Sequence, residues 1–261
     1  MNSFSNIPQI TKNILILNGL FFLATFVLQN QGIDLIALFG AHYVNSPLFK
    51  PYQIITYFFM HSNTDFLHIV FNMLLLVMFG SHLERIWGPK RFFIFYIVSA
   101  IGAFALYNII GVYEIHQLKN ALSSTIDIDS VNNIIRESHT NADLQFRFSN
   151  YLSQLPDYSK IDGVKLAKYI QNSYTPMVGA SGAIFGIMAA FAFLFPNTEL
   201  MLLFPPIPVK AKYLISIYFL YEVYNSYHAP GDNVAHLAHV GGAITGFILV
   251  FIWNKNRKNF Y

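Results

Sequence analysis

The sequence lacks cysteine and contains few charged residues. The absence of cysteine excludes disulfide bonds and thiolate metal sites. Only 11% of the 261 residues are charged, whereas 54% are hydrophobic and 17% are aromatic. Soluble domains carry about 25% charged residues. This composition therefore indicates an integral membrane protein.

The charge that is present also excludes some partners and cofactors. The net charge of +3 is small and spread along the chain, so no nucleic-acid partner is expected. Nine histidines leave a metal site conceivable. However, His68 and Asn72 lack the carboxylate or second imidazole that a zinc site normally adds. We therefore expect neither a metal nor a cofactor.

Six apolar segments are candidates to cross a bilayer, since a spanning helix needs about 20 predominantly apolar residues. They cover residues 14–28, 66–87, 92–112, 177–195, 213–227 and 234–253. The first segment has no small-x-small cleavage site after it, which favours a retained anchor over a cleaved signal peptide. The predicted fold is all-α: a polytopic bundle of six transmembrane helices, forming a single membrane domain over residues 1–261.

Two stretches do not fit a spanning helix. Residues 30–65 are apolar but interrupted by prolines, which predicts a loop lying partly in the membrane interface. Residues 113–174 are polar and charged, with apolar positions at helical spacing in 131–135 and 164–170. This pattern predicts an extramembrane helical insertion between the third and fourth spans.

The basic residues predict the orientation. Six spans place both termini on one side of the membrane. Nine basic residues fall on that side, and only Lys50 falls in the short loops on the other side. The nine are Lys12, Arg85, Lys90, Arg91, Lys210, Lys212, Lys255, Arg257 and Lys258. The positive-inside rule then places both termini in the cytoplasm and the insertion on the outer, extracytoplasmic side.

Polar residues occur in the first turns of three spans that run in the same direction. They are His68 and Asn72 in the second span, Ser181 in the fourth and His239 in the sixth. Each one alone has a structural interpretation, as packing, interhelical bonding or a hydrogen bond within a helix. Together they favour one shared wet cavity, because an unsatisfied polar group in hydrocarbon costs several kcal/mol.

Small residues accompany the serine and the histidine. Gly179, Gly182 and Gly186 flank Ser181, and Gly242 and Gly246 follow His239 by three and seven residues. On a helix, the spacing after His239 places that histidine and both glycines on one stripe. We expect the two glycine stripes to face each other as helix-packing surfaces.

These residues are sufficient for acyl transfer. Ser181 is the candidate nucleophile and His239 the candidate base, with the Ser181 N–H and the side chains of His68 and Asn72 as oxyanion donors. Phe185, one turn beyond Ser181, is positioned to pack against the imidazole. His236 competes with His239 as the base, although it lies nearer the preceding loop.

No carboxylate is expected to complete a triad. Asp65 and Asp232 are in loops, and Glu222 lies near the far end of the fifth span. We therefore predict a Ser-His dyad.

The motifs resemble those of the rhomboid family of intramembrane serine proteases. The Gly-x-Ser-Gly motif is 179–182, the His-x-x-Gly-x-x-x-Gly motif is 239–246, and His68 with Asn72 matches the second-span pattern. The resemblance implies an endopeptidase that cleaves single-span membrane proteins entering between the second and fifth spans. It also implies that Glu84 ties loop and helix ends together. We expect a bacterial inner membrane as the location.

The sequence departs from the family pattern in places. Tyr52-Gln53 stands where many members have Trp-Arg, Phe185 where some have tyrosine, and His61 is more distant from His68 than is usual. An alternative interpretation is a catalytically inactive relative that binds membrane clients. A small transporter using Glu222 and Asn225 is a third. The sequence assigns no role to His61, Glu222 or His236, and names neither a substrate nor an oligomeric state.

Overall fold

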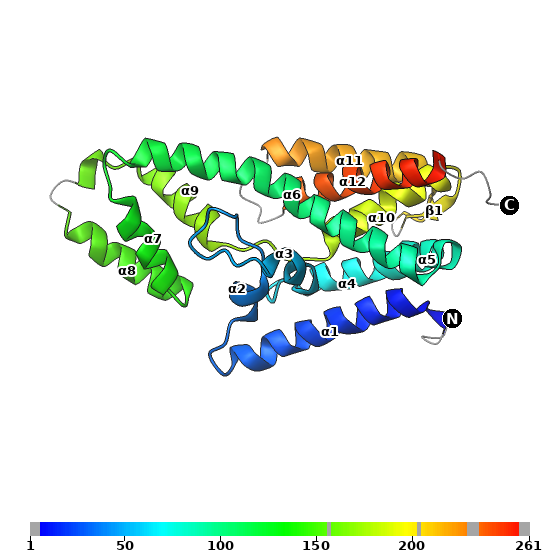
Figure 1. The fold of residues 1–261 in the computed structure, drawn as a ribbon, viewed down its shortest axis with the longest axis horizontal. Coiled ribbons are helices and arrows are strands. Elements are labelled where there is room, and N and C mark those ends of the chain that lie inside the picture. The colour runs from blue at the N-terminus through cyan, green and yellow to red at the C-terminus, as the bar shows by residue number, and fades with distance from the viewer. Residues whose placement is uncertain (1–5, 156–157, 203–204, 229–234, 256–261) are drawn as a thin grey trace. The chain divides into compact units, whose positions relative to one another are not determined.

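The computed structural model describes residues 6–155, 158–202, 205–228 and 235–255, and the fold is helical (Figure 1). The chain groups into two compact units. We call Met1–Gly40, Ile54–Tyr107 and Val178–Tyr261 the membrane unit. We call Ala41–Gln53 and Asn108–Met177 the insertion unit.

Elements outside the insertion are mostly long and apolar. They are α1 (Gln9–Gln29), α2 (Leu35–Phe39), α3 (Gln53–Thr56), the 3-10 turn η2 (Tyr57–Phe59), α4 (Phe66–Leu75), the π turn η3 (Leu76–Gly80), α5 (Ser81–Trp87), α6 (Pro89–Leu122), α10 (Ser181–Leu194), α11 (Ala211–His228) and α12 (His236–Lys255). By length and composition, α1, the continuous α4–α5, α6 and α12 can each cross a membrane, and α10 is a shorter apolar helix. These five and α11 occupy the six expected spans. The predicted polytopic helical bundle is confirmed.

Several boundaries differ from the expected spans. The third span was expected to end at Val112, but α6 continues to Leu122 because Ile115, Leu118 and Leu122 bury one side of the extension. Between α10 and α11, β1 (Glu199–Met201) pairs with β2 (Pro208–Lys210) in an antiparallel hairpin that was not predicted. The expected start of the sixth span, most of the turn before it, Asp232 and the basic residues 257 and 258 lie outside the described residues.

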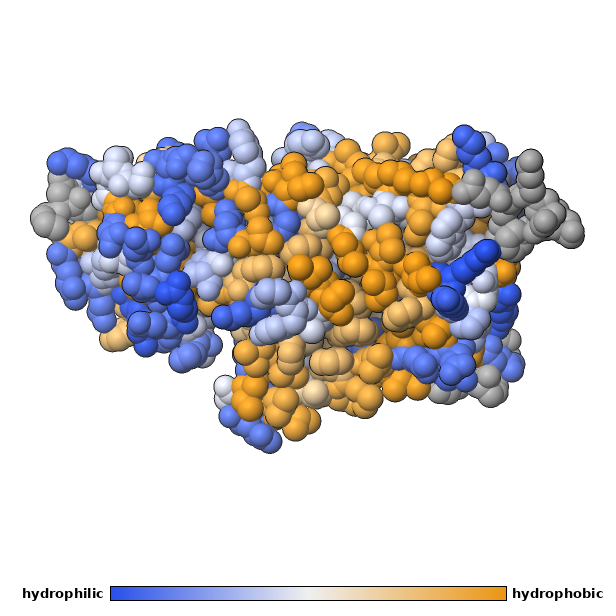
Figure 2. Space-filling view, viewed as in Figure 1, coloured by the Kyte–Doolittle hydropathy of each residue, from blue (hydrophilic) through white to orange (hydrophobic). Residues whose placement is uncertain are grey.

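The surface of the membrane unit is apolar. Large hydrophobic side chains are exposed on α1, α11 and α12, including Leu23, Leu220 and Ile248 (Figure 2). In water such a surface would promote aggregation, whereas lipid chains solvate it. The unit fits contact with a lipid bilayer.

Glu84 on α5 holds the beginning of α1. Its Oε1 accepts from the N–H of Ile10 at 2.8 Å, and its Oε2 accepts from the N–H and the hydroxyl of Thr11 at 2.7 and 2.8 Å. The first N–H groups of a helix have no partner within the helix, so the carboxylate satisfies donors that would otherwise be buried alone. The first span is thereby joined to the end of the second.

Helices α10 and α12 pack with their backbones in close approach. A Cβ atom built on Gly246 would stand 2.5 Å from the Cα of Gly186. One built on Gly186 would stand 2.9 Å from the carbonyl oxygen of Gly242. Only glycines permit this approach. Gly186 and the two α12 glycines therefore face each other, and Gly182 additionally lies against Ala103 of α6.

The insertion unit contains a small helical core of its own. Its helices are α7 (Ile128–Glu137), α8 (Asn141–Ser153), the 3-10 turn η4 (Tyr158–Lys160) and α9 (Gly163–Tyr174). Asp127, Thr140 and Asp162 cap the first turns of α7, α8 and α9. The prediction that this part of the chain is helical is confirmed.

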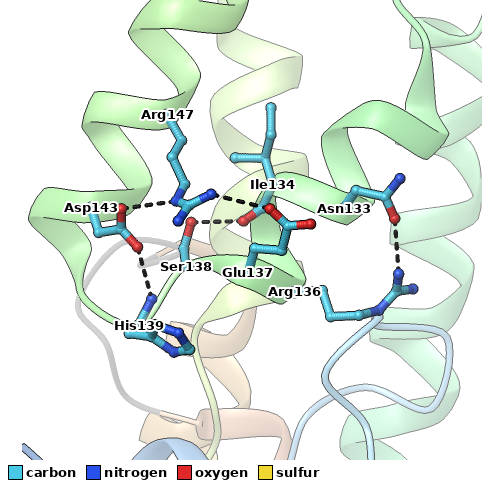
Figure 3. Close-up of polar contacts among 8 residues, drawn as sticks. All are labelled: Asn133, Ile134, Arg136, Glu137, Ser138, His139, Asp143 and Arg147. Carbon is cyan, nitrogen blue, oxygen red and sulfur yellow. Dashed lines mark hydrogen bonds and ion pairs between the residues drawn. The ribbon is translucent and has the colours of Figure 1, made fainter.

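Charged side chains join α7 to α8 within this unit. Arg147 on α8 pairs with Asp143 at 2.8 Å and with Glu137 of α7 at 3.1 Å (Figure 3). Asp143 also accepts from the backbone N–H of His139 in the connection between the two helices.

Residues 41–53 belong to the insertion unit as well, although the sequence suggested an interfacial loop. The Ser46 hydroxyl donates to the carbonyl of Ser173 at 2.6 Å. Ala41 and Met177 exchange backbone hydrogen bonds, each at 2.8 Å. Two segments more than 100 residues apart thus close the unit.

Candidate active site

Ser181 is the first residue of α10, so its side chain lies at a helix N-terminus. Unpaired N–H groups and the positive end of the helix dipole concentrate there. The chain enters this position through Gly179, whose φ of 122° lies in the left-handed region. Its N–H donates to the carbonyl of Tyr57 at 3.2 Å.

Gly179 was expected to pack between helices, and this expectation is corrected. The residue precedes α10, and a Cβ atom there would stand 2.9 Å from Nε2 of His68. The glycine is needed because its positive φ disfavours side chains and because the imidazole lies against its Cα.

His239 lies on the first turn of α12 and meets Ser181 directly. Its Nε2 is 2.8 Å from the hydroxyl oxygen of Ser181, although 58 residues separate the two in the chain. The close approach of α10 and α12 at Gly242, three residues after His239, brings the imidazole to the serine. The side chains thus have the geometry of a nucleophile and its base.

The imidazole of His239 is held on one face by Phe185. The two ring centroids are 4.5 Å apart and the planes differ by 12°, so the rings are stacked. Phe185 is 5% exposed and also contacts the ring of Tyr218 on α11. This packing limits rotation of the imidazole away from Ser181.

The two predicted oxyanion donors occupy different positions. The Nε2 of His68 lies beside Gly179 and faces the entrance to α10. The side-chain amide of Asn72 instead donates to the carbonyl of His68 in its own helix at 2.9 Å. The ring of His61 lies 5.1 Å from that of His68. Of the two, His68 thus has a ring nitrogen beside the residues that lead into α10.

The prediction that no carboxylate is well placed was wrong. Oε2 of Glu222 on α11 lies 2.7 Å from Nδ1 of His239 and 2.6 Å from Nδ1 of His236. The sequence-based prediction placed Glu222 near the far end of the fifth span and therefore away from the site. In the sequence only seven residues, 229–235, separate the end of α11 at His228 from the start of α12 at His236, so the later turns of α11 lie beside the first turn of α12. That connection was the signal in the sequence that could have identified Glu222.

The imidazole at hydrogen-bond distance from the Ser181 hydroxyl is that of His239, whereas His236, the alternative base, has its Nδ1 on Oε2 of Glu222. His236 lies one turn before His239 on α12. The exposed fractions of His236, His239 and Glu222 are 6%, 8% and 2%. They form a buried polar cluster behind Ser181.

The same three residues also form a group whose donor atoms could share a metal ion, because all of these atoms lie within 4.8 Å of one another. Both imidazoles, however, lie at direct hydrogen-bond distance from a single carboxylate oxygen. The carboxylate and the two imidazoles are therefore hydrogen-bond partners of one another. We interpret the cluster as a hydrogen-bond network and not as a metal site.

Comparison with known proteins adds a family match. A model described as the Rhomboid domain matches residues 48–116 and 162–256. The residues between these two ranges, 117–161, fall inside the expected insertion, and the match covers more than half of the chain. Ser181, His239 and Glu222 all lie in the second matched range.

Three relatives are similar over parts of the chain. An uncharacterized mitochondrial rhomboid protein of Schizosaccharomyces pombe is 34% identical over 113 residues, which are 40% of this chain and 28% of that protein. Mitochondrial rhomboid protein 1 of Saccharomyces cerevisiae is 33% identical over 78 residues, 28% of this chain and 21% of the relative. The mitochondrial RHOMBOID-like protein 12 of Arabidopsis thaliana is 27% identical over 197 residues, 76% of this chain and 44% of the relative.

The matched region thus spans less than half the length of each of these relatives. All three are mitochondrial proteins of eukaryotes, which overturns the expectation of a bacterial inner membrane with cytoplasmic termini. The charge bias predicted only the orientation of the helices, and it does not identify the membrane that holds them.

Proposed function

Because this chain belongs to the rhomboid family, we propose that it is an intramembrane serine endopeptidase with Ser181 as nucleophile and His239 as base. The observation that carries the proposal is the 2.8 Å contact between the Ser181 hydroxyl and Nε2 of His239. A serine hydroxyl is a weak nucleophile until a base within hydrogen-bond reach accepts its proton.

The reaction follows from this contact. The Ser181 oxygen attacks the scissile carbonyl carbon while its proton passes to Nε2 of His239. Collapse of the tetrahedral intermediate expels the amine, which takes the proton from the imidazolium. Water then attacks the acyl-enzyme with His239 again as base, which releases the carboxylic acid and restores the serine.

The negative oxygen of the intermediate requires donors aimed at it. The N–H groups at the beginning of α10, including that of Ser181, point out of the helix, and Nε2 of His68 lies next to this position. We assign the oxyanion site to these groups. The Asn72 amide donates to the carbonyl of His68 in its own helix, so we leave it out of this oxyanion site.

The substrate class follows from the apolar surroundings. A peptide bond reaches this site from lipid, so we propose transmembrane helices of single-span proteins as substrates, entering between α4 and α11. The backbone must leave its helical hydrogen bonds before the serine can attack its carbonyl, which favours segments with small or helix-breaking residues.

We also propose a mitochondrial membrane as the location, by similarity to the named relatives. In a six-span arrangement both termini lie on one side of the membrane. The insertion, residues 113–174 of the single rhomboid-like chain, then lies on the opposite side.

The proposal is tested by cleavage of a reporter transmembrane segment in liposomes. Wild-type protein should release product, and Ser181→Ala and His239→Ala should release none above background. Ser226→Ala is the matched control, because its hydroxyl donates to a carbonyl of its own helix and not to this cluster. A fluorophosphonate probe should label the wild type at Ser181 and should not label His239→Ala.

Equal cleavage by the wild type and by Ser181→Ala would exclude the mechanism. Absence of both cleavage and labelling in folded wild-type protein, combined with capture of intact membrane proteins, would instead identify an inactive client-binding relative. The transporter alternative would use Glu222 on an ion path, whereas the contact of this carboxylate with His239, which itself meets Ser181, supports the protease proposal.

A further inference from the structure

We propose that Glu222 completes a Ser181–His239–Glu222 triad and that His236 holds the Glu222 carboxylate in place. This inference rests on the proposed protease function. It changes the mechanism from a dyad to a triad assembled from three different spanning helices. Glu222 acts through His239, so we call it a positioning residue.

The contacts of His239 define its tautomer. A neutral imidazole has one N–H donor and one acceptor nitrogen. Nδ1 lies 2.7 Å from Oε2 of Glu222, and a carboxylate can only accept, so Nδ1 carries the proton. Nε2 is then the acceptor that faces the Ser181 hydroxyl at 2.8 Å. By holding the proton on Nδ1, the carboxylate keeps the lone pair of Nε2 directed at the Ser181 hydroxyl.

The carboxylate also stabilises the charge that forms on the base. When Nε2 accepts the serine proton, His239 becomes an imidazolium whose Nδ1–H remains bonded to Oε2. The Glu222 carboxylate stays ionised throughout, and the proton leaves from Nε2 with the amine. Because the cluster is only 2–8% exposed, water does little to screen this attraction.

A buried carboxylate needs donors of its own. A single hydrogen bond from His239 would leave the charge poorly compensated in apolar surroundings. His236 supplies a second donor to the same oxygen at 2.6 Å, from a position one helical turn before His239. The pair of histidines on α12 therefore fixes the carboxylate from two directions.

Phe185 completes the fixation of the ring. It covers one face of the His239 imidazole at 4.5 Å, while Glu222 and Ser181 bond to its two nitrogens. Rotation about the side chain would break a hydrogen bond at either end. The three contacts together pre-organise the base before substrate arrives.

The test measures reporter cleavage, labelling and unfolding temperature for Glu222→Gln. A glutamine amide can donate to Nδ1 and so favour the wrong tautomer, an effect that lowers kcat by about 10⁴ in soluble serine proteases. We expect kcat to fall by about 10²–10⁴-fold, with KM within about twofold of wild type. The fluorophosphonate labelling rate should fall in proportion, because the probe needs the activated serine but no substrate helix.

His236 provides a rescue that a general structural role would not give. His236→Ala should lower kcat by about tenfold, since one donor to Oε2 is lost. His236→Asn places an amide N–H near the position of Nδ1 and should restore most of kcat. Ser226→Ala on α11 serves again as the control that removes a hydrogen bond outside the cluster.

The outcomes separate this inference from the proposed function. If wild-type protein cleaves and is labelled while folded Glu222→Gln keeps kcat within twofold, the triad is wrong and the dyad stands. If the wild type neither cleaves nor is labelled, the protease function itself fails.

If Glu222→Gln does not fold, proton NMR of the wild type decides. A strongly downfield imidazole N–H resonance that disappears in His239→Gln supports the bond to the carboxylate. The absence of such a resonance in wild-type protein overturns the triad.

Discussion

A Cβ atom built on Gly242 of α12 would overlap the carbonyl oxygen of Gly182 on α10. The two helices are therefore as close as two backbones can pack. His239 is one turn from this point, so the distance from its imidazole to Ser181 depends on the missing side chain at Gly242.

Gly242→Ala should separate α10 from α12. The added methyl meets backbone, which cannot rotate away, so we expect a loss of about 1–3 kcal/mol in the free energy of unfolding. Cleavage should fall at least tenfold as His239 moves. Thermal unfolding in detergent and the reporter assay measure the two effects.

Gly19→Ala is the matched control for this substitution. Gly19 lies inside α1 with no atom within 4 Å of an added Cβ. Alanine should leave activity unchanged and stabilise the helix by about 0.5–1 kcal/mol. If Gly242→Ala and Gly19→Ala had equal cleavage rates and equal stability, the close contact between Gly242 and the Gly182 carbonyl would be refuted.

Phe185→Ala should lower kcat by about 2–10-fold with little change in KM. Stacked aromatic pairs contribute about 0.5–1.5 kcal/mol beyond their buried area, and here the lost contact is the one that holds the base. Phe193→Ala removes ring contacts to Phe247 and Phe251 from the same helix without touching His239. If Phe193→Ala impaired kcat as strongly, the effect would belong to helix packing.

His68→Ala should reduce kcat by about 10²–10³-fold, the usual cost of one lost oxyanion donor. Asn72→Ala should cost less, because its amide is bonded to the carbonyl of His68 in its own helix. Single-turnover kinetics of both variants give the comparison. A larger loss in Asn72→Ala would place its amide in the oxyanion site during the reaction.

Glu84→Ala should destabilise the protein without altering the chemistry. It removes the acceptor of three hydrogen bonds from Ile10 and Thr11, and each bond to a charged group contributes about 1.5–3 kcal/mol. We expect Glu84→Ala to unfold at a temperature several degrees lower than the wild type. Below that temperature, the fluorophosphonate labelling rate should equal that of the wild type. Arg85→Ala, which removes an exposed contact to Asn6, should change stability by less than about 0.5 kcal/mol.

Acid should loosen α7 in the insertion unit. The hydroxyl of Ser130 and the N–H of Asp129 bond to Asp127 and hold the pKa of this carboxyl below its usual 3.8. A lowered pKa in the folded state gives stability that is present above pH 3.8 and lost as the pH falls through the folded value. Hydrogen exchange of residues 128–137, corrected for the intrinsic rate, should therefore quicken below about pH 3.8.

Asp127→Asn gives the control, because asparagine caps a helix about as well and does not titrate. Its exchange protection should change little over the same pH range. If wild-type and variant α7 responded alike to acid, the Asp127 carboxylate would not be the cause.

Local patterns were enough to predict much of this protein. Runs of apolar residues predicted the helical bundle, and the polar composition of 113–174 predicted a helical insertion. The spacing of Gly242 and Gly246 after His239 predicted a packing stripe on α12. Each of these features depends on residues within one or two helical turns of one another in the sequence, so it can be predicted without knowing the fold.

Other features depended on segments far apart in the chain. Residues 41–53 pack with the insertion through contacts such as that of Ser46 with Ser173, which no periodicity encodes. The unpredicted β1–β2 hairpin and the left-handed φ of Gly179 are decided by their surroundings as well. The charge bias, for its part, carried no information about which membrane holds the chain.

The sequence by itself determined the candidate reactive groups: a serine between glycines, a histidine followed by two glycines on the same helix face, and an aromatic ring one turn after the serine. Only the tertiary structure decided that Glu222 reaches Nδ1 of His239 and that the Asn72 amide bonds within its own helix. A hydrogen bond between helices requires atoms within about 3 Å, and that distance is set by how three helices pack rather than by any one of them.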